Sequence, residues 1–159
     1  MAENRKPAII LVDDEEMILT SIRTLLLLET DYQVESFTNP IEAAKYLEKN
    51  PADVAVSDYL MPGMNGIQLL AEAKRLQPEA TRVLLTGHAD KASAIRAINE
   101  VGLFQYLEKP WDNEQLLLVI QQGLERAQLL RELRQKISEL DTAHSTLKSA
   151  QARLLKAFL

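Results

Sequence analysis

The sequence lacks cysteine, an excess of positive charge and long apolar runs, and each absence excludes a class of protein. Without cysteine, the 159-residue chain can form neither a disulfide nor a thiolate metal site. A net charge of -5 argues against sequence-independent nucleic-acid binding as the main role. No apolar run approaches the roughly 20 residues that span a bilayer, and the N-terminus MAENRKPAII lacks the apolar core of a secretion signal. We therefore expect a cytoplasmic protein.

Five short β-rich runs alternate with helical patterns. Three of the runs are almost continuously apolar, which is typical of strands buried on both faces of a parallel sheet. The intervening patterns predict helices that bury Ile41, Ile95 and Ile98 among their apolar residues. This alternation predicts an α/β fold, a flavodoxin-like doubly wound five-stranded parallel sheet with strand order 2-1-3-4-5. The expected strands are Ala8–Val12, Gln33–Phe37, Val54–Ser57, Arg82–Thr86 and Phe104–Leu107.

The fifth expected helix is much longer than a sheet-covering helix needs to be. Asp112 is a plausible N-cap, and from there to Leu159 the chain has no proline and a single glycine, Gly123. Beyond it, leucines recur at heptad spacing, which predicts a coiled coil. One heptad position holds Leu130, Ile137 and Phe158, and the other holds Leu133, Leu140, Leu147 and Leu154.

Polar residues interrupt this heptad pattern. His144 and Gln151 occupy a positions. There they either mark a frayed end of the helix or fix the register of a two-stranded coiled coil. Lys136 at g and Asp141 at the following e would attract each other in a parallel dimer. We therefore predict a homodimer through the C-terminal helix, with a four-helix arrangement or a helix folded back on itself as alternatives. Because residues 112–159 carry seven Lys/Arg and six Asp/Glu, we expect no direct nucleic-acid contact and no membrane contact.

Carboxylates follow two of the expected strands. Asp13 and Asp14 end the first strand, and Asp58 ends the third. In this strand order the ligand crevice lies between strands one and three, at their carboxyl ends. Three unpaired carboxylates there would repel one another, and Mg²⁺, which prefers oxygen ligands, would relieve the repulsion. Asp13 and Asp14 could instead cap the next helix, but Asp58 at the matching strand end favours the metal site.

Two further strand ends carry groups that suit a phosphate. Thr86, followed by a glycine, ends the fourth strand, and Lys109 follows the fifth. A threonine hydroxyl can donate to a phosphate oxygen, and a lysine can act as a point cation. Either residue alone is a weak signal, but together with the carboxylates they predict a phosphoryl-handling site.

Four short motifs fall at these strand ends: V12-D-D-E15, D58-Y-L-M-P-G-M-N-G66, T86-G-H-A89 and the Lys109-Pro110 pair. In this order and at this spacing they resemble the receiver domain of bacterial two-component response regulators, over roughly residues 7–125.

The resemblance implies a role for each residue of the site. Asp58 would accept a phosphoryl group from the phosphohistidine of a sensor histidine kinase or a phosphotransfer protein, and Thr86 and Lys109 would contact that group. Tyr106 matches the switch aromatic, which would pass the signal to the surface of the fourth helix, fifth strand and fifth helix. Lys109 and Pro110 would be joined by a cis peptide.

The resemblance also implies a Mg²⁺ site. Asp14 and Asp58 would bind the ion directly, Asp13 would bind it largely through water, and the backbone carbonyl of Leu60 would add a ligand. The predicted role is regulatory and not enzymatic. A phosphatase with an aspartyl nucleophile is one alternative, although such enzymes carry a second aspartate where Leu60 stands. A degenerate receiver acting as a dimerisation scaffold is another.

The expected domains are a receiver at residues 1–125 and a coiled-coil helix at residues 126–159, continuous with the fifth helix. Because the heptads reach the last residues, we expect the chain to be cut within a longer helix that leads to an output domain. A stand-alone protein whose helix binds a partner is the alternative.

Overall fold

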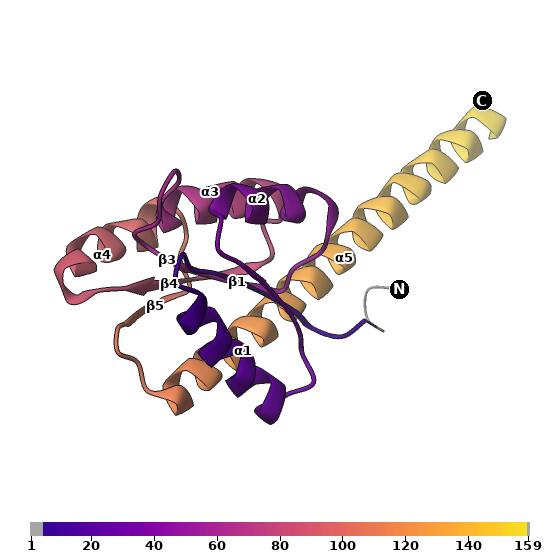
Figure 1. Ribbon diagram of the computed structural model, residues 1–159. Helices are drawn as coiled ribbons and strands as arrows, with labels where there is room; N and C mark the ends of the chain where they lie inside the picture. Colours follow the sequence, from indigo (N-terminus) through magenta and orange to yellow (C-terminus); the bar gives the residue numbers. More distant parts are fainter. Residues whose placement is uncertain (1–4, 159) are drawn as a thin grey trace. The chain divides into compact units, whose positions relative to one another are not determined.

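Five parallel strands in the order β2-β1-β3-β4-β5 form the sheet of the computed structural model, which describes residues 5–158 (Figure 1). This order confirms the predicted flavodoxin-like α/β fold. The sheet comprises β1 (Ala8–Val12), β2 (Gln33–Phe37), β3 (Val54–Asp58), β4 (Thr81–Thr86) and β5 (Gln105–Glu108). The third strand extends one residue further than expected, so that Asp58 is its last residue.

Helices cover both faces of this sheet (Figure 1). They are α1 (Glu16–Glu29), α2 (Pro40–Lys49), α3 (Gly66–Leu76), α4 (Lys91–Glu100) and α5 (Asn113–Phe158), with a 3-10 turn at His88–Asp90. The alternation along β1 explains its continuous apolar run: Ile9 and Leu11 pack in the core with α1 and the start of α5, while Ile10 and Val12 pack with α2 and α3.

The predicted buried faces of two helices were wrong in part. Ile41, Ile95 and Ile98 are 46%, 48% and 37% exposed. On α4 the residues against the sheet are Ala94, which belonged to the predicted face, and Ala97, which did not; both are almost completely buried. Small side chains allow close approach of the helix axis to the sheet, so the larger isoleucines lie toward solvent.

Helix α5 begins at Asn113. The side chain of the preceding residue, Asp112, accepts a hydrogen bond from the backbone N–H of Glu114 at 3.0 Å. The hydroxyl of Thr81 donates to the carbonyl of Gly123 at 2.5 Å, and a Cβ at Gly123 would lie only 2.9 Å from the Thr81 Cγ2 atom. This close approach explains why the one glycine of α5 stands here.

The chain divides into two compact units, the first ending at Ala127 and the second beginning at Gln128. The second unit is helical as far as Phe158. Over residues 5–158, no helix combines the length and apolar character that crossing a lipid bilayer requires.

Candidate functional site

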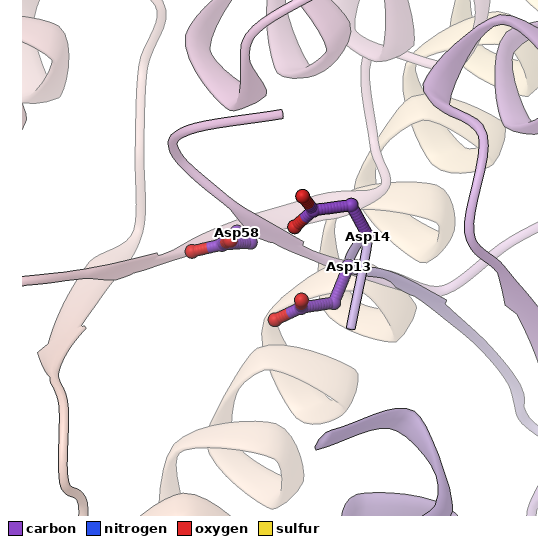
Figure 2. A group of neighbouring side chains, drawn as sticks. All are labelled: Asp13, Asp14 and Asp58. Atoms are coloured by element: carbon purple, nitrogen blue, oxygen red, sulfur yellow. The ribbon is translucent and has the colours of Figure 1, made fainter. Parts of the chain in front are cut away.

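Three carboxylates meet at the carboxyl ends of β1 and β3. Pairing of Val12 with Ser57 places the residues that follow each of them at one edge of the sheet. Asp13, Asp14 and Asp58 each offer an oxygen, and these atoms all lie within 4.8 Å of one another (Figure 2). The structure therefore brings together the three side chains that the sequence predicted as metal ligands.

The carboxylates differ in exposure. Asp13 is 1% and Asp58 is 7% exposed, while Asp14 is open to solvent. The Asp13 Oδ1 atom accepts the backbone N–H of Glu15 at 2.9 Å. Two buried carboxylates so close together need cationic neighbours, because burial and like charge both disfavour ionisation.

The loop after Asp58 is fixed by backbone contacts. The N–H of Tyr59 donates to the Leu85 carbonyl at 3.0 Å, and the N–H of Gly66 donates to the Tyr59 carbonyl at 2.7 Å. Asn65 then caps α3 through a reciprocal capping box with Gln68. The loop therefore starts and ends at fixed points beside Asp58.

Between these two points, one hydrophobic side chain of the loop is exposed and the next is buried. The Leu60 side chain is 61% exposed, while Met61 is buried. Gly63 has a φ of 85°, in the left-handed region that glycine adopts without strain.

Lys109 supplies the nearest cation. Its Nζ atom lies 2.9 Å from the Asp58 Oδ1 atom and 3.4 Å from the Asp13 Oδ2 atom. Its backbone N–H donates to the Thr86 carbonyl at 2.8 Å, and the Lys109-Pro110 peptide is cis, as the sequence predicted. Burial by itself lowers the pKa of Lys109, but its bonds to the two carboxylates outweigh burial and raise it.

The pKa of Asp13 is raised from its ordinary 3.8 to about 6. The main cause is burial, and the charge of Asp58 adds to it; the bonds from the Glu15 N–H and from Lys109 act in the opposite direction. One ammonium beside three ionised carboxylates also leaves the site with net negative charge. A donor set of three carboxylates with this residual negative charge fits a small divalent cation such as Mg²⁺.

Thr86 and Tyr106 lie on adjacent strands. Thr86 is completely buried, and its hydroxyl donates to the Gly87 carbonyl at 3.1 Å. Within the described residues this hydroxyl makes no bond to Asp58 or Lys109. Tyr106 is half-buried beside the core that includes Ala94, on α4. Thr86 thus lies at the end of β4 and Tyr106 on the neighbouring β5, and among the described residues neither side chain bonds to Asp58.

Sequence reasoning missed one contact at the edge of the site. The Nδ1 atom of His88 lies 2.6 Å from a carboxylate oxygen of Glu108. The two residues are 20 positions apart, and pairing of Thr86 with Glu108 between β4 and β5 brings them together. No local pattern could have shown this pair, since it depends on strand register.

Comparison with solved structures identifies the fold. The signal receiver domain of an HD domain-containing protein from Pseudomonas fluorescens Pf-5 matches with 37% identity and a TM-score of 0.73, over 78% of this chain and 98% of that one. A structure described as adenylate cyclase from Rhodopirellula baltica matches with 27% identity and a TM-score of 0.79, over 84% of this chain and 98% of that one.

The family model of the response regulator receiver domain matches residues 9–121. The chain therefore belongs to the response regulator receiver domain family, which functions in two-component signalling.

Curated relatives are longer proteins. The hydrogenase transcriptional regulatory protein HoxA of Cupriavidus necator is 28% identical over 152 residues, which are 96% of this chain and 31% of HoxA. The transcriptional regulatory protein GlrR of Escherichia coli is 32% identical over 124 residues, which are 78% of this chain and 28% of GlrR. The chain thus spans about a third of the length of these relatives.

Proposed function

We propose that Asp58 accepts a phosphoryl group from the phosphohistidine of a sensor histidine kinase or a phosphotransfer protein. The observation that carries this proposal is the position of Lys109, whose Nζ atom lies 2.9 Å from Asp58 and 3.4 Å from Asp13. In the transfer, the P–N bond to the donor imidazole breaks and a P–O bond to the Asp58 carboxylate forms. The imidazole leaves with the bonding electron pair.

The residues around Asp58 suit this transfer. Phosphoryl transfer needs positioning and neutralisation of charge more than covalent chemistry by the protein. Lys109 would neutralise charge on the incoming oxygens. Asp14 and Asp58 would hold Mg²⁺ directly, with the Leu60 carbonyl as a further ligand and Asp13 acting largely through water. When bound, the ion would neutralise charge on the phosphoryl oxygens.

The same site supports a proposal for the switch. A phosphoryl group adds negative charge and acceptor oxygens beside β4. The Thr86 hydroxyl, which donates to the Gly87 carbonyl, would turn toward those oxygens. Tyr106 would then occupy the vacated space and change the surface formed by α4, β5 and α5.

Phosphorylation is tested with a small-molecule phosphodonor, with and without Mg²⁺. The wild-type chain should gain one phosphoryl group per molecule only with the ion, and Asp58→Asn should gain none. Continuous release of phosphate from a phosphate ester would instead indicate an aspartyl-nucleophile phosphatase. Absence of any labelling of the wild-type chain would indicate a degenerate receiver that acts as a scaffold.

We further propose that residues 1–125 form the regulatory receiver, and that residues 126–159 form a coiled-coil helix that pairs two copies. The exposed leucines of α5, among them Leu133, Leu140, Leu147 and Leu154, support pairing. The greater length of relatives named as transcriptional regulatory proteins supports transmission along α5 to an output module or a partner.

A further inference from the structure

The apolar seam of α5 is exposed from Leu133 to Phe158. Its residues fall at the a and d positions of successive heptads, and such a row covers one face of a helix. They are between 51% and 86% exposed, so the described unit itself does not bury them. These seam residues are Leu133, Ile137, Leu140, Leu147, Leu154 and Phe158.

A second copy of this helix is the occupant that the seam fits. The seam has the heptad period of a helix pair, and its flanks carry one charged pair that is complementary in the parallel orientation. In a parallel, in-register pair, Lys136 at g would face Asp141 at e of the other copy. An antiparallel pair would place a residues opposite d residues and would lose this match.

His144 interrupts the seam at an a position and is exposed. In a parallel, in-register pair, residues at a position meet their own counterparts across the axis. On the basis of the dimer proposed above, we propose that His144 of each copy faces His144 of the other. This layer of two histidines makes dimerisation weaker as the solution is acidified.

The charged neighbours of His144 do not offset this effect. One turn before it stands Asp141 and one turn after it stands Lys148, so their charges cancel. Asp141 would also be engaged by Lys136 of the other copy, while Lys148 would face Ala143, which carries no charge. The other groups around the layer, Leu140 and Leu147, are apolar. Two facing imidazolium ions would therefore lack a carboxylate of their own.

The direction of the pH effect on dimerisation follows from proton linkage. An ordinary imidazole gains its proton near pH 6.5. Two facing imidazolium ions repel each other, so the paired state disfavours this proton. The dimer then holds fewer protons than two monomers, and its dissociation constant rises as pH falls. Exclusion of one proton per dimer gives about a tenfold rise for each pH unit below this value, and exclusion of two gives about a hundredfold.

The test is sedimentation equilibrium of the 159-residue chain at pH 8 and pH 5.5. The wild-type dimer should be at least about tenfold weaker at the lower pH. His144→Leu should abolish the pH dependence. Gln151→Leu, which replaces the other polar a residue, should strengthen the dimer at both pH values and keep the dependence. His88→Asn removes the other histidine of the chain and should also keep it.

The parallel orientation of the two helices is tested by a separate cross-linking experiment. Because the chain has no cysteine, Leu133→Cys introduces a single thiol, which should form an intermolecular disulfide in a parallel, in-register dimer. A dimer that does not cross-link through this thiol, or whose affinity is the same at both pH values, would overturn the His144 layer while leaving the dimer intact. A monomer at both pH values would instead overturn the proposed dimer.

Discussion

The backbone carbonyl oxygen of Asp58 occupies the space in which a side chain at Gly66 would begin. A Cβ at Gly66 would overlap this oxygen and would lie 2.9 Å from the Leu84 Cδ1 atom. The N–H of Gly66 also closes the loop by donating to the Tyr59 carbonyl at 2.7 Å. Gly66 therefore belongs to the structure of the Asp58 site, although it offers no functional group.

Gly66→Ala should move the backbone of Asp58, because the carbonyl cannot give way as a flexible side chain could. We expect a loss of about 1–3 kcal/mol in the free energy of unfolding and slower phosphorylation of Asp58. Urea denaturation measures the loss. Gly87→Ala is the matched control, since a Cβ there meets only an Asp90 oxygen at 3.7 Å. Equal stability of Gly66→Ala and wild type would contradict the close contact.

Asp13 should make stability depend on pH in the absence of metal. Its pKa is about 6 in the folded chain against an ordinary 3.8, so between these values the folded state holds a proton that the unfolded state releases. The free energy of unfolding should therefore fall as pH rises from about 4 to about 6, by at most about 3 kcal/mol from this group.

Asp13→Asn should flatten this part of the stability curve, measured by urea denaturation in the presence of a chelator. Asp31→Asn, which removes an exposed carboxylate, is the control and should keep the slope. If Asp13→Asn retained the full wild-type slope, another group would have to be responsible.

Mg²⁺ binding should depend on Asp14 even though this residue is exposed. Removing one of three carboxylates whose oxygens lie within 4.8 Å lowers the charge that attracts the ion. We expect Asp14→Asn to weaken Mg²⁺ binding at least about tenfold by calorimetric titration. Glu16→Gln removes an exposed carboxylate of the first turn of α1 and should bind as wild type does. Equal affinities in the two variants would exclude Asp14 as a ligand.

Thr86→Ala should separate phosphorylation from the switch. Asp58 and Lys109 would remain in place, so the phosphodonor assay should still label the chain. The change in amide hydrogen exchange at residues 105–108, caused by the phosphoryl mimic beryllofluoride, should be largely lost. Thr86→Ser keeps the hydroxyl and should respond as wild type does. A normal response of Thr86→Ala would show that the hydroxyl does not couple the two events.

The sequence by itself determined the fold class and the identity of the groups at the strand ends. Apolar runs such as Val54–Ser57, with turn residues after them, specify buried parallel strands, because such strands need apolar side chains on both faces. Strand order and the carboxyl-end rule then placed Asp13 and Asp58 at one edge. The heptad pattern of α5 could also be recognised from the local sequence, since the periodicity of a helix depends only on residues in neighbouring turns.

The tertiary structure alone decided which side of a helix meets the sheet and which atoms meet in the site. On α4 the apolar pattern fits more than one face, and close packing buried Ala97 beside Ala94 while it left Ile95 exposed. Likewise, the contacts of Lys109 with Asp58 and of His88 with Glu108 depend on strand register. Register and packing arise from contacts between residues far apart in the chain, so the local pattern around any one of these residues cannot specify them.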